Sequence, residues 1–268
     1  MLDDEIKASR MLIGRERLFY WGWLGREMRT RRLGALTLYT LPEGDFEISI
    51  ADGPFTRKRM AVVSPFVPHQ LRSSSGRIAT ISIEPESVSD RDLQRLIHDC
   101  QSSSTEVLAS LGGSVRQLAR MGSTSGFSSA DFDRLVLGRV LTQRRIDPRI
   151  GRILDLMSSE VHEQALSAED CAREAGISTS RFLHLFKECT DYSFRAQRMW
   201  KRARRFMDHA GAETSLTDVA LELGYPDSSH FSHSIRGTYG LQPRAIRQGS
   251  RGIKISFGEG YAVSELCA

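Results

Sequence analysis

Two stretches of sequence decide the fold: SAEDCAREAGISTSRFLHLFK at residues 167–187 and SLTDVALELGYPDSSHFSHSIR at residues 215–236. Aligned on Gly176 and Gly224, the two stretches repeat the same residue types in the same order. The other matching pairs are Asp170 with Asp218, Ala172 with Ala220, Glu174 with Glu222, Ser180 with Ser229, Phe182 with Phe231, His184 with His233 and Lys187 with Arg236. The repeat predicts two copies of a unit in which two helices are joined by a tight turn.

Each repeated residue type has a physical reason to be in its place. A small residue in the first helix, Ala172 or Ala220, lets the second helix pack closely across it. The glycine at the turn adopts a positive φ without the steric penalty of a Cβ. Ser178 and Asp227 precede the second helices and are suitable N-caps. The pattern therefore predicts two helix-turn-helix units.

The second helix of each unit is predicted to have one buried face and one exposed polar face. Phe182 and Phe231 lie on the buried face. The polar face is the one that we expect to enter a major groove of DNA. The predicted base-reading residues are Ser180, Leu183, His184, Ser228, Ser229, Ser232 and His233. The predicted phosphate contacts are Thr179, Arg181, Lys187, Arg195, Arg198 and Arg236.

A basic helix is predicted between the units, at FRAQRMWKRARRFMDH, residues 194–209, with Ser193 as its N-cap. About 16 helical residues span roughly 24 Å, so this spacer can separate two recognition helices by about one turn of DNA, roughly 34 Å. Its cations are Arg195, Arg198, Lys201, Arg202, Arg204 and Arg205. They face DNA phosphates in one interpretation and form salt bridges on a solvated face of the helix in the other.

Residues 147–247 resemble the DNA-binding domain of the AraC/XylS family of transcription regulators. The motifs that carry the resemblance are Ala172-x-x-Ala-Gly, Ser178-x-x-Arg-Phe-Leu-x-x-Phe-Lys, Ala220-x-x-Leu-Gly-Tyr, Ser229-His-Phe-Ser and Gly240-Leu-Gln-Pro243. The chain departs from the family at three kinds of position. Asp191 stands where many relatives have a glycine, His184 and His233 stand where relatives often have arginine, and Gly237 is expected to fray the second recognition helix.

The N-terminal half is expected to be a β-sandwich followed by helices. Residues 33–87 contain short runs rich in β-formers between turn residues, and residues 89–141 follow helical spacing. Residues 61–69, AVVSPFVPH, resemble the cupin-like sensor half of the same family. The expected fold class is therefore α+β: a cupin-like β-sandwich with dimerisation helices, then an all-α domain of two helix-turn-helix units.

The expected domains are a sensor and dimerisation domain at 1–145, a DNA-binding domain at 146–250 and a tail at 251–268. The tail has a short strand-like run at residues 253–257. The expected partners are double-stranded DNA, a second copy of the chain, RNA polymerase and an unidentified small-molecule effector. Activation and repression are both compatible with such a chain.

The amino-acid composition is compatible with a DNA-binding protein but does not distinguish it from other classes of protein. The chain is 40% hydrophobic and carries a formal net charge of +4, but residues 147–250 have 14 Lys/Arg and 14 Asp/Glu. A basic face there must come from the arrangement of the charges. The four cysteines, at positions 100, 171, 189 and 267, are widely spaced and are expected to be reduced. With no signal-peptide core and no long apolar stretch, we expect a cytoplasmic protein without membrane contact.

Other classes of function have weaker support in the sequence. A metal-dependent cupin needs clustered ligands, but the strand region offers only His69, interpreted as a loop residue, with His98 in the helix that follows. No P-loop, dinucleotide-binding or nucleophile-elbow motif is present, so we expect no catalysis, cofactor or metal. Tyr20, Trp21 and Trp23 either line a pocket or belong to the core. The alternatives are a helical protein-interaction adaptor and a cupin-type small-molecule binder without catalysis.

Overall fold

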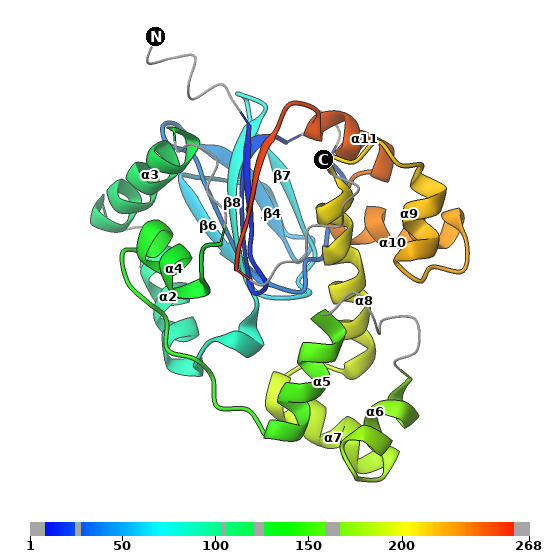
Figure 1. Cartoon of the computed structure of the whole chain (residues 1–268). Coiled ribbons are helices and arrows are strands. Elements are labelled where there is room, and N and C mark those ends of the chain that lie inside the picture. Colours follow the sequence, from blue (N-terminus) through cyan, green and yellow to red (C-terminus); the bar gives the residue numbers. More distant parts are fainter. Residues whose placement is uncertain (1–8, 25–27, 103–104, 121–125, 159–166, 260–268) are drawn as a thin grey trace.

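The computed structural model describes residues 9–24, 28–102, 105–120, 126–158 and 167–259. Strands come first in the chain and are followed by helices and one last strand in the residues that the structure describes (Figure 1). The predicted α+β class is confirmed. The domain boundaries at residues 145 and 250 remain predictions.

Two sheets make up the N-terminal half. Their strands are β1 (Arg10–Ile13), β2 (Arg17–Trp23), β3 (Leu36–Thr40), β4 (Phe46–Ile50), β5 (Thr56–Lys58), β6 (Met60–Val63), β7 (His69–Arg72), β8 (Arg77–Ile83) and β9 (Lys254–Phe257). The larger sheet has the order β6-β3-β8-β2-β1-β9, and the smaller sheet has the order β5-β4-β7. Apolar side chains of both sheets, among them Phe19, Leu38, Phe46 and Leu71, share one core. The predicted sandwich is therefore present.

The first two strands of the large sheet were not predicted from the sequence. In β1 all four residues are buried, and in β2 only Trp23 is exposed. Because both faces of these strands are covered, the alternation of apolar and polar residues that marks a half-buried strand is absent. Trp21 belongs to the core, whereas Tyr20 and Trp23 line a cavity described below.

The last strand, β9, comes from the segment that was predicted as a separate tail. It pairs in parallel with β1, in a register that places Arg10 beside Lys254 and Ile13 beside Phe257. The strand-like run at residues 253–257 is thus part of the sheet of the N-terminal half. The C-terminal residues of the described chain tie the two halves together.

Three helices cover one side of the N-terminal half (Figure 1): α2 (Asp90–Ser102), α3 (Thr105–Arg120) and α4 (Ser129–Leu137). Their buried side chains, such as Leu96, Leu111 and Phe132, join the core of the sandwich. A buried ion pair also holds helix α4 against the sheet. Arg17 on β2 donates to both carboxylate oxygens of Asp133, at 2.7 and 3.1 Å, and both side chains are buried.

The C-terminal half is helical, as predicted. Its helices are α5 (Pro148–Ser158), α6 (Ala168–Glu174), α7 (Thr179–Thr190), α8 (Phe194–Arg205), the 3-10 turn η3 (Phe206–His209), α9 (Leu216–Glu222), α10 (Ser228–Tyr239) and α11 (Pro243–Ser250). The predicted α-helix at 194–209 is shorter than expected, because its last four residues form the 3-10 turn. Helix α11 was not predicted; Pro243 occupies its first turn.

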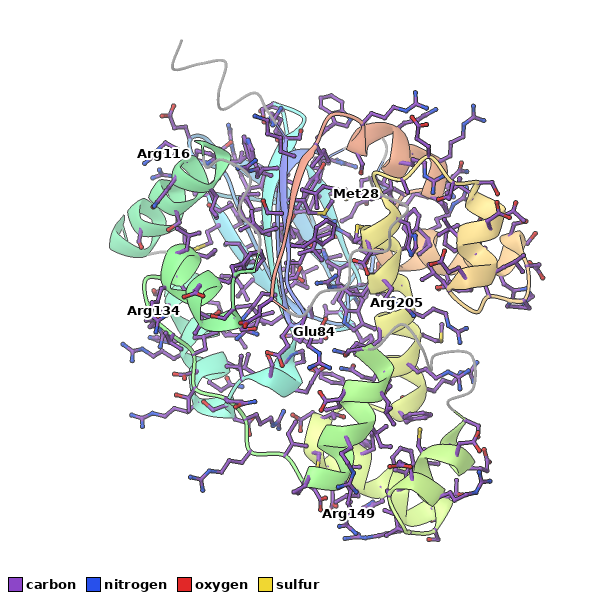
Figure 2. The ribbon with its side chains drawn as sticks, viewed as in Figure 1. Met28, Glu84, Arg116, Arg134, Arg149 and Arg205 are labelled. Carbon is purple, nitrogen blue, oxygen red and sulfur yellow. The ribbon has the colours of Figure 1, made fainter. Side chains whose placement is uncertain are left out.

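The two halves meet at a buried network of charges. Glu84, just before the short 3-10 helix η1 (Pro85–Ser87), accepts hydrogen bonds from Trp200 Nε1 and from Lys201 Nζ on α8, each at 3.0 Å. Lys201 also lies 2.7 Å from Glu86, and Arg204 donates to the Gly14 carbonyl. Figure 2 shows Glu84 between the sheet and α8.

This network corrects the interpretation of α8 as a phosphate-binding face. Lys201, Arg204 and Arg205 are buried and point into the protein, so these three cations are not available to DNA. Lys201 and Arg204 do form salt bridges, as in the other interpretation, but in the interior of the protein and not on a solvated face. Arg195 is exposed and Arg198 is half-buried, so both remain candidates for phosphate contact.

Candidate DNA-binding surface

The first helix-turn-helix unit consists of α6 and α7. Ser167 caps α6, and the hydroxyl of Ser178 accepts a hydrogen bond from the backbone N–H of Arg181 to cap α7. Gly176 has φ +66° at the turn between the helices. Phe182 and Phe186 pack on Phe194 at the start of α8, with ring centroids 5.2 and 5.4 Å apart. The N-cap, the turn and the buried face that were predicted here are therefore present.

The second unit, α9 and α10, repeats this construction. Ser215 caps α9, Asp227 caps α10 through Ser229 and His230, and Gly224 has φ +71°. Phe231 on α10 packs against Phe206 with ring centroids 5.2 Å apart. In both units, therefore, a phenylalanine of the second helix packs against an aromatic ring of the segment that links the units.

Two departures from the family pattern have clear structural outcomes. Asp191, in place of a glycine, ends α7 in the left-handed region at φ +66°, a conformation that short polar residues tolerate better than other non-glycine residues. Its carboxylate pairs with Arg144 at 2.8 Å. Gly237 does not fray α10, because that helix continues to Tyr239 and closes on Gly240 at φ +72°.

The predicted DNA contacts lie where solvent can reach them. All seven predicted base-reading residues are exposed: Ser180, Leu183, His184, Ser228, Ser229, Ser232 and His233. Among the predicted phosphate contacts, Arg181, Lys187 and Arg195 are exposed, and Thr179, Arg198 and Arg236 are partly buried. Exposure is necessary for contact with DNA but does not establish it, so these assignments remain predictions.

The exposed face of α7 contains an acid among its cations. Glu188 lies 3.2 Å from His184 Nε2 and 4.0 Å from Arg181. All three side chains are more than half exposed, so these contacts contribute little to stability. Glu188 therefore does not hold Arg181 strongly, and the phosphate contact of Arg181 remains a prediction.

The exposed face of α10 lies beside the N-terminal half. His233, Arg236 and Gly237 line a depression together with Arg29, Thr30 and Gln70. Arg236 also lines the large cavity between the halves. The second unit is therefore in direct contact with the half that is expected to sense an effector.

The two kinds of predicted contact can be separated by substitution on α7. His184→Ala should weaken binding to the preferred site by about 1–3 kcal/mol and relax base preference locally. Lys187→Ala should weaken binding to all sequences alike and reduce the slope of log K against log salt by about one. The measurement is the affinity for the preferred duplex and for an unrelated duplex at several salt concentrations. A sequence-independent loss from both variants would contradict the assignment of His184 as a base-reading residue.

His69 is not the loop residue that was expected. It begins β7, is buried, and hydrogen-bonds through Nε2 to the Tyr39 hydroxyl at 2.7 Å and through Nδ1 to the Val67 carbonyl at 2.8 Å. Burial, together with the charge of nearby Arg31, lowers the pKa of His69 to about 3. His69 is thus a neutral core histidine. Among the described residues, no three His, Cys, Asp or Glu side chains are grouped to hold a metal ion.

Two further features bear on the class of protein. Cys100, Cys171 and Cys189 are free thiols, and Cys267 lies outside the described residues. In the part of the chain that the structure describes, no helix combines the length and the apolar character needed to cross a membrane.

Fold and surface together define a helix-turn-helix protein with a β-sandwich domain, and comparisons with known proteins agree. A helix-turn-helix domain model matches residues 171–249. The HTH-type transcriptional activator RhaS of Escherichia coli is 43% identical over 52 residues, which are 19% of this chain and 18% of RhaS. The alignment therefore spans about a fifth of that relative.

Similarity of fold extends over most of the chain. ToxT from Vibrio cholerae O395, bound to (E)-4-(8-methylnaphthalen-1-yl)but-3-enoic acid, superposes with a TM-score of 0.55 at 12% identity, covering 87% of this chain and 98% of ToxT. Another ToxT structure gives 0.52 at 11% identity, with the same coverage of each chain. Both findings support the predicted resemblance to the AraC/XylS family: residues 171–249 match a helix-turn-helix domain in sequence, and the two-part fold is similar to that of ToxT.

Proposed function

We propose that the protein is a cytoplasmic, non-catalytic transcription regulator that binds duplex DNA with both helix-turn-helix units. The observation that carries the proposal is the repeat itself, since two independently capped second helices present polar, exposed faces. A protein-interaction adaptor would need an apolar exposed face. On these two faces the one large exposed apolar side chain among the described residues is Leu183, which can contact a thymine methyl group.

In this proposal the N-terminal half regulates the binding of DNA by the C-terminal half. A small effector binds through it, and its helices α2 to α4 carry the contact with a second copy of the chain. RNA polymerase is the further partner expected of a regulator that acts at a promoter. The structure supports the effector most directly, because α10 contacts the N-terminal half along the residues that line the depression described above.

A footprint of the protein on its operator tests the proposal. Each protomer should protect two major-groove segments about 10 base pairs apart, centre to centre. The combined variant Ser229→Ala, Ser232→Ala and His233→Ala should lose the segment read by α10 and keep the segment read by α7. These three side chains are exposed, so the fold should be unaffected.

A single protected segment per protomer that is unchanged in the triple variant would overturn the use of both units. The triple variant Thr217→Ala, Asp218→Ala and Glu222→Ala is a matched control, because it removes exposed polar groups from α9 instead of α10. The control should leave both segments protected.

A further inference from the structure

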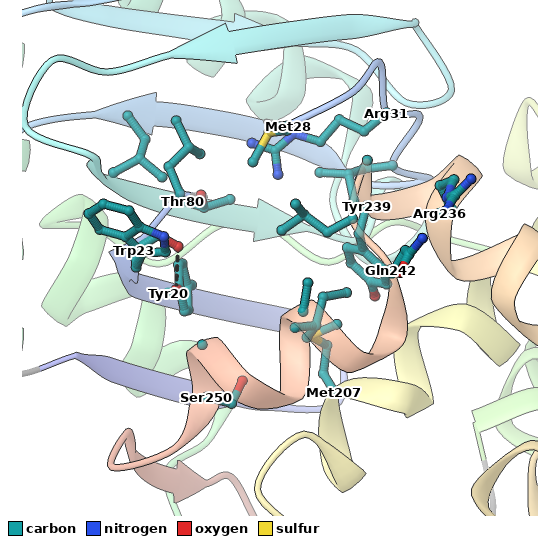
Figure 3. A pocket seen from close by; sticks show the side chains of 18 of the residues that line it. Tyr20, Trp23, Met28, Arg31, Thr80, Met207, Arg236, Tyr239, Gln242 and Ser250 are labelled. Atoms are coloured by element: carbon teal, nitrogen blue, oxygen red, sulfur yellow. Dashed lines mark hydrogen bonds between the residues drawn. The ribbon is translucent and has the colours of Figure 1, made fainter. Parts of the chain in front are cut away.

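A segment of the N-terminal half runs beside the second recognition helix. Residues 28–32, here called the strap, lie between β2 and β3 in the sequence. The strap borders a cavity of about 740 Å³ between the two halves, which Tyr20 and Trp23 also line. Figure 3 shows Arg31 of the strap and Arg236 of α10 on the same side of this cavity. The strap therefore lies where the sandwich meets the second helix-turn-helix unit.

The small sheet fixes one side of the strap. Arg31 and His69 of β7 exchange two backbone hydrogen bonds, of 2.9 and 3.1 Å. The side chain of Gln70, also on β7, donates through Nε2 to the Met28 carbonyl at 2.8 Å. These bonds hold the backbone of the strap against the edge of the small sheet.

The end of α10 fixes the other side of the strap. The N–H of Arg29 donates to the Gly240 carbonyl at 3.0 Å. The N–H of Arg32 donates to the carbonyls of Gly237 and Thr238, at 3.2 and 3.1 Å. A Cβ on Gly240 would clash with the Arg29 carbonyl oxygen, so the two segments are in close contact. The last carbonyls of a helix carry partial negative charge, and the strap satisfies three carbonyls at this end of α10.

The strap also brings arginines to the exposed face of α10. Arg29 and Thr30 line the depression that contains His233 and Arg236, and the described residues around this depression include no acid. The side chains of Arg29 and Arg32 are exposed. Neither of them, nor Arg236, has an ion-pair partner in the described part of the chain. A concave surface with cations and no acid attracts anions.

The place of the depression indicates that the anion is a DNA phosphate. His233 and Arg236 belong to the face of α10 that is predicted to enter the major groove. A helix with its side chains is about 10–12 Å across, and the major groove of B-DNA is about 12 Å wide. Because such a helix fills the groove, residues beside the helix face the phosphates along the edge of the groove. Arg29 is such a residue.

The distribution of charge along the chain also favours a contribution of the N-terminal half to DNA binding. Residues 147–250 have 14 Lys/Arg and 14 Asp/Glu, whereas residues 1–146 have 21 Lys/Arg and 17 Asp/Glu. The formal net charge of +4 therefore comes from the half without the helix-turn-helix units. Contacts with phosphates supply much of the affinity of proteins for DNA, so a recognition half without net charge gains from cations outside it.

We infer that the strap is a third DNA contact, in which Arg29 binds a backbone phosphate at the edge of the groove read by α10. The small sheet and α10 hold the backbone of the strap, so the contact needs little ordering when DNA binds. Phosphate contacts carry no sequence information directly, so the strap adds affinity for every sequence. This inference rests on the proposed DNA-binding function.

Arg29→Ala in the full chain tests the contact. Affinity for the preferred duplex and for an unrelated duplex should fall alike, about three- to tenfold, and the slope of log K against log salt should fall by about one. Arg29→Lys should retain most of the affinity, because lysine also binds phosphate. The Arg29 side chain is exposed, so the Tm of Arg29→Ala should equal that of the wild type.

The matched control is Arg91→Ala. Arg91 is an exposed arginine at the start of α2 and likewise has no ion-pair partner in the described chain. Helix α2 lies on the other side of the sheets from α10 (Figure 1). This variant should bind both duplexes with the affinity and the salt dependence of the wild type.

Ethylation of single phosphates along the preferred duplex locates the contact. Ethylation should interfere with binding of the wild type at one or two phosphates beside the segment read by α10, and these should no longer interfere with Arg29→Ala. Interference beside the segment read by α7 should be the same for both proteins. The pattern of Arg91→Ala should match that of the wild type throughout.

The results that would overturn the inference are distinct from those that would overturn the proposed function. An unchanged affinity, salt slope and ethylation pattern of Arg29→Ala, with two protected segments in the wild type, would refute the strap contact alone. Tighter binding by Arg29→Ala would also refute it, and would show that the strap obstructs α10. A wild type that binds neither duplex would refute the proposed DNA-binding function itself.

Discussion

Lys201→Met is expected to lower the free energy of unfolding by about 3–5 kcal/mol. Lys201 is the cation that lies between Glu84 at 3.0 Å and Glu86 at 2.7 Å, and all three side chains are buried. The substitution leaves two carboxylates in the interface with only Arg204 near them, 3.9 Å from Glu84. Because burial already raises the pKa of Glu84 to about 7, the carboxylates would take up protons or the halves would separate.

Urea unfolding of the full chain measures this loss. The control is Arg195→Met on the same helix, which removes an exposed cation and should change stability by no more than about 0.5 kcal/mol. Adding Glu84→Gln and Glu86→Gln to Lys201→Met should restore most of the stability, since no buried charge is then left unpaired. Equal losses from Lys201→Met and Arg195→Met would show that the network does not hold the halves together.

Arg17→Met should also lower the free energy of unfolding by about 3–5 kcal/mol, here by loosening the contact between β2 and α4. Arg17 joins β2 to α4 through two hydrogen bonds to Asp133, and it also donates to the Ser87 hydroxyl at 2.7 Å. Asp133 in turn accepts from the Leu141 backbone. Without Arg17 the buried carboxylate keeps one neutral donor, so α4 and the segment after it should loosen from the sheet.

Hydrogen exchange locates the effect of Arg17→Met. Amides of α4 and of residues 138–142 should exchange faster, whereas those of α6 and α7 should not change. Arg134→Met is the matched control, because that neighbour pairs with Asp131 on the surface and should have little effect. Faster exchange across the whole chain, without enrichment at α4, would contradict a local role for this ion pair.

The helix-turn-helix units could be predicted from the sequence because their determinants are local. A cap such as Ser178, a turn residue such as Gly176 and a buried residue such as Phe182 lie within one short stretch, and each acts on its near neighbours. Their types and spacing therefore carry the structural information directly.

The cavity and the charged interface could not be predicted in this way. Arg31 and Gln242 line one cavity but are far apart in sequence, and no periodicity links them. From the sequence, the cations of α8 were interpreted as exposed. Their buried position could not be predicted, because the partners of Lys201, Glu84 and Glu86, belong to the other half of the chain. Buried strands such as β1 were missed because a fully covered strand does not alternate.

The pairing of β9 with β1 has a consequence for how the chain is made. Strand β1 ends at Ile13, and its partner begins at Lys254. At a synthesis rate of 5–20 residues per second, on the order of ten to fifty seconds separate the two. During that time one edge of β1 is open, and an open edge can pair with another nascent chain. This edge of β1 therefore stays open until residues 254–257 have been synthesised and have left the ribosome.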